Sequence, residues 1–276
     1  MMTQPTIGIV GLGTMGLGIA QVYAAAGFAV IATDAHAPAR SSAQDRMAAA
    51  LQARISAGKL TPEGRDSTLA NLRVSDSLAD LAPCALVIEA IIEQAEAKRA
   101  LFGDLETHLS ATAVLATNTS SIPVATIAHG ARHPERILAL HFFNPPTAMK
   151  LVELAPHAGT AAAALACARD LTQTAGKTVV QCPDRPGFIV NRCARPFYGE
   201  ALALLEEGRN PQEIDAALQG AGYRLGPLSL IDLIGADINL AATLGLFDAM
   251  DQNPRYHPFD VLKAQVALGN LGRKSG

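Results

Sequence analysis

Residues 6–20, TIGIVGLGTMGLGIA, decide the fold of this chain. An apolar stretch, Thr6–Val10, is followed at once by the GxGxxG motif of residues 11–16. In a strand–turn–helix unit the first glycine of this motif permits a tight turn, and the second lets the backbone approach a pyrophosphate. The third glycine allows close packing of helix on strand, and the helix N-terminus supplies N–H donors. We therefore predict that a dinucleotide binds at Gly11, Gly13, Thr14, Met15 and Gly16.

Asp34 indicates which dinucleotide binds. It ends the second predicted strand, residues 29–33, where a carboxylate can accept both ribose hydroxyls. The same carboxylate would repel the 2′-phosphate of NADP, and the next residues, Ala35 and His36, supply no arginine to offset that repulsion. The sequence therefore predicts NAD as the cofactor. The alternative is a glycine-rich turn followed by a surface aspartate without a ligand.

Short apolar runs alternate with helical patterns through the first two thirds of the chain, as in a parallel sheet with crossover helices. After the Pro-rich segment 182–187 only helical patterns follow. We predict a Rossmann-type doubly wound α/β domain, residues 1–183, and an all-α domain, residues 184–276. Strands are expected at 6–10, 29–33, 72–75, 85–89, 113–117, 137–140, 151–154 and 178–181, and helices at 14–26, 38–57, 61–69, 94–109, 161–175, 188–207, 211–219, 228–234 and 238–250.

The amino-acid composition indicates a globular protein and argues against several other classes. The chain has 276 residues, enough for two domains, with 49% hydrophobic and 17% charged residues, which is typical of a globular protein. A net charge of −3 argues against nucleic-acid binding. The four cysteines form no CxxC pair, so we expect no metal site and reduced thiols in the cytoplasm. The uncharged stretch 1–33 lacks a basic leader and is broken by glycines, so we expect neither a signal peptide nor a membrane span.

Hydride transfer from an alcohol needs a base, and histidine is the usual one at neutral pH. Of seven histidines, His141 follows an apolar strand and so lies at the carboxyl edge of the predicted sheet, where ligands bind. The other six lie in polar or turn segments and are expected to face solvent. Glu153 lies in an apolar run and needs a partner if buried, which His141 would provide. On the residues alone, a catalytic histidine and a structural core histidine remain equally open.

A series of motifs along nearly the whole chain resembles the 3-hydroxyacyl-CoA dehydrogenase family. These motifs are residues 11–20, IEAIIEQAEAKRALF at 88–102, TNTSSI at 117–122, HFFNP at 141–145, KLVEL at 150–154, PGFIVNR at 186–192, GP at 226–227, DLIG at 232–235 and GRKSG at 272–276. The resemblance implies reversible oxidation of an (S)-3-hydroxyacyl-CoA to the 3-ketoacyl-CoA with NAD, an activity of fatty-acid metabolism and β-oxidation. Acyl-chain length, a dicarboxylyl preference and the physiological direction are not set by these motifs.

The resemblance also implies roles for individual residues. By it, His141 is the base and Glu153 its partner, while Ser120 and Asn191 hydrogen-bond the substrate oxygen. Ser120 could instead cap the following helix, and Asn191 could lie on a helix surface. The resemblance also implies that Glu93, Lys98, Ser120, Asn144 and Lys274 contact the cofactor. It carries over no contact with the CoA group, for which our candidate is Lys59, at the end of the predicted helical arm of residues 38–59.

Two apolar segments of the helical domain, 228–234 and 238–247, carry apolar residues on more than one face, which a small domain cannot bury alone. Together with the resemblance, this predicts a homodimer centred on residues 195–250. Two other functions stay open. A 3-hydroxyisobutyrate-type dehydrogenase would need a lysine in a glycine-rich helix start, and Gly176-Lys177 lacks the flanking glycines. A λ-crystallin-like member that binds NAD in a structural role would have a broken catalytic set.

Overall fold

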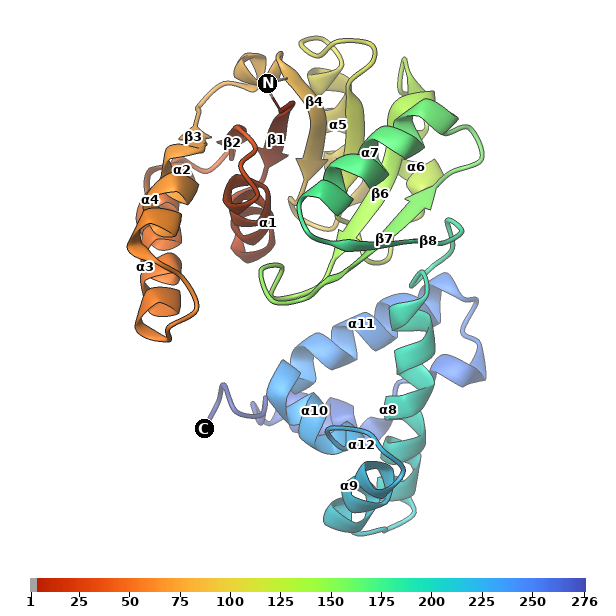
Figure 1. The fold of residues 1–276 in the computed structure, drawn as a ribbon. Helices are drawn as coiled ribbons and strands as arrows, with labels where there is room; N and C mark the ends of the chain where they lie inside the picture. Colours follow the sequence, from red (N-terminus) through yellow and green to blue (C-terminus); the bar gives the residue numbers. More distant parts are fainter. Residues whose placement is uncertain (1–3) are drawn as a thin grey trace. The chain divides into compact units, whose positions relative to one another are not determined.

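The computed structural model describes residues 4–276; residues 1–3, the first of the uncharged stretch and of the expected first domain, lie outside the described residues. The chain forms two compact units (Figure 1), of which the first ends at Asp184 and the second begins at Arg185. This division falls inside the Pro-rich segment expected to link two domains.

The first unit is built on an eight-stranded sheet in the order β3-β2-β1-β4-β5-β6-β7-β8. Neighbouring strands are parallel except β6 and β7, which are antiparallel. Because β1 lies between β2 and β4, the order of the strands reverses beside β1, which is where open α/β sheets bind ligands. This confirms the predicted Rossmann-type sheet. The strands are β1 (Thr6–Val10), β2 (Val30–Thr33), β3 (Leu72–Val74), β4 (Cys84–Glu89), β5 (Val114–Thr117), β6 (Ile137–Phe142), β7 (Leu151–Pro156) and β8 (Thr178–Gln181).

The core lies between the sheet and its helices. Alternate residues of each strand point to one face, so Ile7 and Ile9 pack with residues of α1 (Thr14–Ala25), α3 (Ala43–Ser56) and α7 (Ala162–Thr174) in one cluster. A hydrogen bond of 2.8 Å between the hydroxyls of Tyr23 and Thr172 joins α1 to α7. Helices α5 (Ala95–Leu105) and α6 (Val124–Ala128) add no residue to that cluster and lie on the other face (Figure 1).

Several expected elements differ from the structure in their bounds, and two of them have a clear physical reason. The single helix expected at 38–57 is divided into α2 (Ala37–Ser41) and α3, and the Ser42 hydroxyl between them donates to the Pro38 carbonyl at 2.7 Å. Serine competes for backbone groups in this way and favours helix ends. The sixth strand continues two residues further than expected, because its ladder with β7 extends through the pairs His141↔Glu153 and Phe142↔Val152. Helices α2 and α3, with α4 (Pro62–Ala70) after them, form the helical arm of residues 37–70.

The second unit is helical, as predicted. Its core is formed by Tyr198, Leu202, Ile231, Leu240 and Leu262, with helices closing around them. The sequence prediction missed the last helix, α12, which has only eight residues and one fully buried apolar side chain. The helices are α8 (Val190–Glu206), α9 (Pro211–Gly220), α10 (Pro227–Ile234), α11 (Ala236–Ala249) and α12 (Asp260–Ala267); 3₁₀ turns occupy Leu78–Leu81, Pro134–Arg136 and Pro254–Tyr256.

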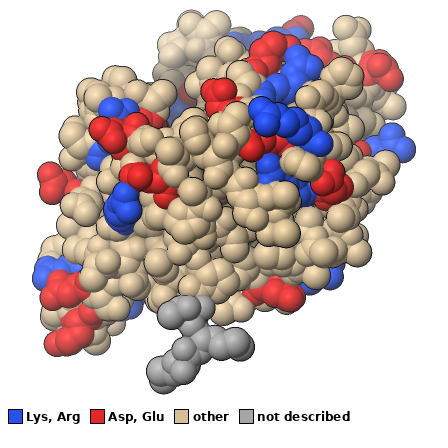
Figure 2. Space-filling view, turned by 90° about the horizontal axis from the view of Figure 1, so that it is seen from above, with Lys and Arg blue, Asp and Glu red and all other residues tan. Residues whose placement is uncertain are grey.

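The longest helix within residues 4–276 is α8, with 17 residues. Taken singly, no helix in this range combines the length and apolarity of a membrane span; α10 and α11 pass only as a pair, with a bend of 103° between them. Nor do these residues contain three or more His, Cys, Asp or Glu side chains grouped to hold a metal ion. On the face shown in Figure 2, basic and acidic side chains are interspersed.

Candidate functional site

The glycine loop after β1 has the form of a phosphate cradle. Gly11 has φ +100°, which disfavours any residue with a Cβ. A Cβ at Gly16 would lie 1.8 Å from the Gly11 carbonyl oxygen, whereas one at Gly13 would meet nothing within 4 Å. No side chain caps α1 at Gly13, so the N–H groups of its first turn are available to a ligand. These features fit the pyrophosphate of a dinucleotide.

Asp34 ties the end of β2 to this loop. One carboxylate oxygen accepts the Leu12 N–H at 2.6 Å, and the other accepts the His36 N–H at 2.8 Å. The next two residues, Ala35 and His36, supply no arginine, but one further along the chain lies close. Arg40, one helical turn further, donates to the backbone carbonyls of Asp34 and Ala35 at 2.5 and 3.0 Å. Its Nη1 is therefore engaged by the loop backbone.

His141 and Glu153 form a buried pair near the end of β6 and the start of β7. They are directly opposite in the antiparallel ladder, and His141 Nδ1 lies 2.8 Å from Glu153 Oε2. The Glu153 side chain is 1% exposed and that of His141 9%, so the two groups meet away from bulk water. Cys182 lies close by. Burial, and then the charges of Glu153 and Asp184, raise the pKa of its thiol to about 12, which keeps it neutral at physiological pH.

A second buried ion pair lies at the end of β4. Lys98 Nζ is 2.6 Å from Glu89 Oε1 and 3.2 Å from Glu93 Oε2. The side chains of Lys98 and Glu89 are 1% and 0% exposed. Glu89 also accepts the Thr117 hydroxyl at 2.7 Å and the Ile91 N–H at 2.7 Å. A buried carboxylate with an ion pair and two further donors is well satisfied, so this cluster is rigid.

Glu93 connects this ion-pair cluster to the loop after β5 through hydrogen bonds. Its Oε1 accepts the Thr119 hydroxyl at 2.6 Å, the Ser120 N–H at 3.0 Å and the Ser121 hydroxyl at 3.0 Å. Burial alone would raise the pKa of Glu93, but the charge of Lys98 and these hydrogen bonds outweigh it and lower the pKa. The carboxylate is therefore ionised at neutral pH and fixes the backbone at Ser120.

Asn118 joins this loop to the histidine strand. Its side-chain oxygen accepts the Phe142 N–H at 2.8 Å, and its own N–H donates to the Glu89 carbonyl at 2.8 Å. The ends of β4, β5 and β6, which carry Glu89, Ser120 and His141, are thus held together at one edge of the sheet. That edge is shared with the glycine loop after β1, since the Ala90 N–H donates to the Val10 carbonyl at 2.7 Å.

Two family models cover almost all of this chain. The 3-hydroxyacyl-CoA dehydrogenase NAD binding domain matches residues 6–185, and the C-terminal domain of the same enzymes matches residues 187–276. The chain belongs to the 3-hydroxyacyl-CoA dehydrogenase family. The first unit is accordingly an NAD-binding domain, and the glycine loop is where that cofactor fits.

Relatives with known names agree with this family. The chain is 45% identical over 278 residues to a 3-hydroxyadipyl-CoA dehydrogenase of Escherichia coli K12, covering 100% of this chain but only 58% of that protein's length. It is 38% identical to a 3-hydroxybutyryl-CoA dehydrogenase of Mycobacterium tuberculosis, covering 98% and 96% of the two chains. The crystal structure of an (S)-3-hydroxybutyryl-CoA dehydrogenase from Ralstonia eutropha superposes with a TM-score of 0.92 at 36% identity, covering 98% and 96%.

The remaining expected site residues lie in the loop after β6, after α3 and in the helical unit. Asn144 is exposed after β6, where it precedes a cis proline. Lys59 is exposed at the tip of the helical arm, after α3. In the helical unit, Asn191 is half-buried in the first turn of α8, and Lys274 Nζ lies 2.5 Å from Asp237 Oδ1 at the start of α11.

Two expectations about polar residues need correction. Ser120 does not cap the following helix, because the first N–H groups of α6, at Val124 and Ala125, donate to the Asp184 carboxylate at 2.8 and 2.9 Å. The histidines outside the site are also not all exposed. His157 is half-buried, and its Nε2 lies 2.8 Å from the Pro134 carbonyl oxygen.

Three polar residues that hold the candidate site and its neighbouring loop were not predicted from the sequence: Glu89, Asn118 and Lys177. Glu89 ends an apolar strand, and the rule that found a partner for Glu153 would also have required one for Glu89. Lys177 Nζ donates to the carbonyls of Pro146 and Met149 at 2.6 and 2.8 Å and so closes the loop that carries Asn144. Burial lowers the pKa of Lys177. No local pattern indicates this lysine or Asn118, because their partners come from other elements.

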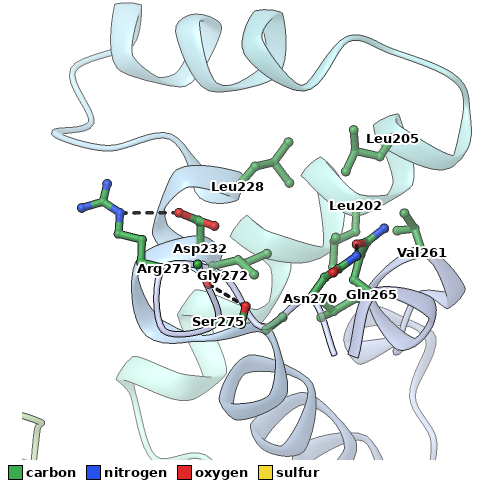
Figure 3. A pocket seen from close by; sticks show the side chains of 14 residues that line it. Leu202, Leu205, Leu228, Asp232, Val261, Gln265, Asn270, Gly272, Arg273 and Ser275 are labelled. Atoms are coloured by element: carbon green, nitrogen blue, oxygen red, sulfur yellow. Dashed lines mark hydrogen bonds and ion pairs between the residues drawn. The ribbon is translucent and has the colours of Figure 1, made fainter. Parts of the chain in front are cut away.

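The helical unit contains a separate hollow of about 480 Å³ (Figure 3). Apolar side chains of α8, α10 and α12, among them Leu202, Leu228 and Val261, face it together with the chain end. At its edge Arg273 Nε lies 3.5 Å from Asp232 Oδ2. None of the expected catalytic residues lines this hollow.

Proposed function

We propose that this chain catalyses the reversible oxidation of an (S)-3-hydroxyacyl-CoA to the 3-ketoacyl-CoA, with NAD as the hydride acceptor. The observation that carries the proposal is the buried pair of His141 and Glu153, held at the same edge of the sheet as the glycine loop. The chain spans 58% of the E. coli relative but nearly all of the M. tuberculosis one, and both are named as 3-hydroxyacyl-CoA dehydrogenases of different acyl groups.

In the proposed reaction NAD, when bound, takes up the hydride that leaves C3 of the substrate. His141 accepts the proton of the 3-hydroxyl group on Nε2 and passes it to solvent, so that two electrons and two hydrogens leave the alcohol. Glu153 fixes the ring through Nδ1 and balances the positive charge that the imidazole acquires. In the reverse direction the same groups return the proton to the oxygen.

We assign the substrate oxygen to the hydroxyl of Ser120 and the amide of Asn191. A donor at this oxygen stabilises the negative charge that develops as its proton leaves. The support in the first unit is the network through Lys98 and Glu93, which fixes the Ser120 backbone before substrate arrives. Glu93 and Lys98 would then act on the cofactor side mainly by holding this loop, since the Lys98 side chain is 1% exposed.

His141→Gln tests the proposal. We expect kcat to fall by about 10²–10⁴, the usual scale for loss of a general base, with NADH affinity nearly unchanged. Steady-state kinetics with acetoacetyl-CoA and NADH fluorescence titration give the two quantities. The matched control is His108→Gln, which should leave kcat unchanged because His108 is exposed in the turn after α5. Wild-type turnover in His141→Gln would return this residue to a structural role.

We further propose that the enzyme is a cytoplasmic homodimer of fatty-acid metabolism. The cysteines of the described chain are all free thiols, which suits a reducing compartment. In the helical unit, Leu233, Ile234, Ile238 and Leu244 are 49%, 39%, 51% and 38% exposed on α10 and α11. Apolar side chains exposed together in this way are typical of an interface, and two-fold pairing is its commonest form.

A further inference from the structure

Arg195, in α8, is a buried arginine without a carboxylate partner among residues 4–276. The residue is 7% exposed, and its Nη1 donates to the Asn239 carbonyl and the Thr243 hydroxyl of α11 at 3.0 and 3.1 Å. The guanidinium carbon lies 4.8 Å from the centre of the Tyr198 ring. Burial lowers the pKa of the guanidinium, yet arginine does not deprotonate in proteins, so a positive charge remains enclosed.

The comparison with Arg136 shows what Arg195 lacks. Arg136 is 3% exposed, and its Nη2 lies 3.6 Å from Glu106 Oε1, whose side chain is 1% exposed. A buried charge is normally paired in this manner, because an unpaired one is strongly destabilising. Arg195 has only neutral oxygens and an aromatic face around it.

The neighbouring Asn239 adds a second unsatisfied group. Asn239 is 2% exposed, and neither its side-chain oxygen nor its side-chain nitrogen has a hydrogen-bond partner in the described chain. Arg195 Nε is enclosed and unpartnered as well, and Nη2 takes no part in the bonds that hold the guanidinium. Buried polar groups are nearly always hydrogen-bonded, so this cluster of N–H donors around one positive charge is suited to an anion.

The position of Arg195 on its helix relates this cluster to the substrate. Arg195 and Asn191 are four residues apart and therefore lie on the same face of α8, about 6 Å apart along the axis. Side chains of a helix lean toward its N-terminus, so the arginine leans toward the turn that carries Asn191. Under the proposed function, Asn191 binds the oxygen on C3. The thioester is uncharged and the CoA phosphates are remote from C3, so an anion only a few bonds from C3 has to be the far end of the acyl group.

We propose that Arg195 and Asn239 form a subsite for the terminal carboxylate of a short dicarboxylic 3-hydroxyacyl-CoA. The carboxylate supplies the negative charge that the buried guanidinium lacks, and it accepts N–H bonds from Arg195 and, after rotation of the amide, from Asn239. This inference rests on the proposed function and names its substrate class. The enzyme is then selective for acyl chains that end in an acid rather than in a methyl group.

The test uses two substrates of equal length, 3-ketoadipyl-CoA, which ends in a carboxylate, and 3-ketohexanoyl-CoA, which ends in a methyl group. Their kcat/KM values are measured with NADH in the full chain. We expect the wild type to favour 3-ketoadipyl-CoA, and Arg195→Gln to lower kcat/KM for that substrate by about 10–100-fold, as for loss of a charge-assisted hydrogen bond. The value for 3-ketohexanoyl-CoA should change less than about threefold. Arg209→Gln, which removes an exposed arginine just after α8, is the matched control and should alter neither value.

The outcomes separate the two proposals. Activity on neither substrate would reject the dehydrogenase function itself. Activity on both without preference for 3-ketoadipyl-CoA in the wild type would overturn the subsite and leave the dehydrogenase standing. Equal losses on both substrates in Arg195→Gln would show that the arginine only braces α8 against α11. If that variant does not fold, Arg195→Lys keeps the charge but not the planar fork, and its loss should again be confined to the dicarboxylic substrate.

Discussion

Single side chains carry the predictions about cofactor choice. The Asp34 carboxylate, which we expect to bind the ribose hydroxyls, also accepts the Leu12 N–H of the glycine loop. Arg40 lies beside it but is engaged by backbone carbonyls. A change at Asp34 therefore alters both the charge at the ribose and the geometry of the loop, and the two effects can be separated.

Asp34→Ala should raise KM for NADH and narrow the gap in kcat/KM between NADH and NADPH, since the repulsion of a 2′-phosphate is lost. Asp34→Asn keeps an oxygen for the Leu12 N–H but removes the charge. It should narrow the gap with a smaller rise in KM for NADH. Steady-state kinetics with both cofactors give the answer, and an unchanged preference in both variants would remove Asp34 from the cofactor assignment.

The buried ion pair of Lys98 and Glu89 should respond strongly to loss of one partner. Lys98→Met leaves Glu89 as an uncompensated buried charge, which should lower the free energy of unfolding by about 3–5 kcal/mol. The double variant Glu89→Gln with Lys98→Met removes both charges and should regain part of that loss. Urea unfolding of the wild type and of both variants provides the values. Equal stability of the single and double variants would contradict the pairing.

Individual elements depend on partners from outside themselves. Helix α6 has five residues, too few to be stable alone, and its first N–H groups are capped by Asp184 from the segment that precedes the helical unit. Asp215 of α9 caps α10 in the same way, through the N–H groups of Leu228 and Ser229 at 2.9 and 2.8 Å. A carboxylate is favoured at such an end by the N–H donors and by the helix dipole.

Asp184→Ala should therefore lower the free energy of unfolding by about 0.5–2 kcal/mol, the usual effect of removing a cap. Asp184→Asn, which keeps an acceptor oxygen, should lose less. Chemical denaturation followed by circular dichroism measures both changes, and Asp76→Ala is a control at a carboxylate with no capping bond in the structure. A stability equal to wild type in Asp184→Ala would show that α6 is held by its apolar contacts alone.

The antiparallel ladder of β6 and β7 brings together His141 and Glu153, the proposed catalytic pair. Side chains alternate along a strand, so a register slip of one residue would turn Glu153 to the opposite face from His141. The buried neighbours Leu140, Val152 and Leu154 fix the register, because a slip would also move them out of the core. The pair is thus set by hydrophobic burial around it rather than by its own attraction.

At the scale of the whole molecule, the proposed homodimer follows from what the helical unit leaves uncovered. Helices α10 and α11 expose Leu233, Ile238 and Leu244, and the hollow beside α10 is lined by apolar side chains. The Asp232 carboxylate of α10 lies 3.5 Å from Arg273 of its own chain. Asp232 already has a charged partner within its own chain, so the apolar side chains would contribute most of the association energy.

Light scattering at micromolar concentration should give twice the mass of the chain. Ile238→Glu should shift the protein toward the monomer, because a charge in an apolar contact is costly to desolvate. Glu200→Gln, an exposed position on α8, should leave the mass unchanged. A wild-type monomer at these concentrations would reject the dimer, and the apolar helices would then need a different cover.

Features that depend on residues close together in the chain could be predicted from the sequence: most helices and strands, and the residue types expected at the site. The glycine loop, Asp34 at the end of β2 and the alternating strands follow from local sterics and from the period of the apolar residues. His141 and Glu153 could be paired because one buried carboxylate required a partner.

Contacts between segments that are distant in the chain were visible only in the tertiary structure. The contacts of Lys98 with Glu89 and Glu93, of Asn118 with Phe142, and of Lys177 with the loop after β6 join groups from different elements. The period of a helix or strand shows which of its own side chains share a face. It does not show which other element packs against that face. The order of the strands and the packing of the helices choose among these possibilities, because only one arrangement buries the apolar faces and also satisfies the polar groups enclosed with them.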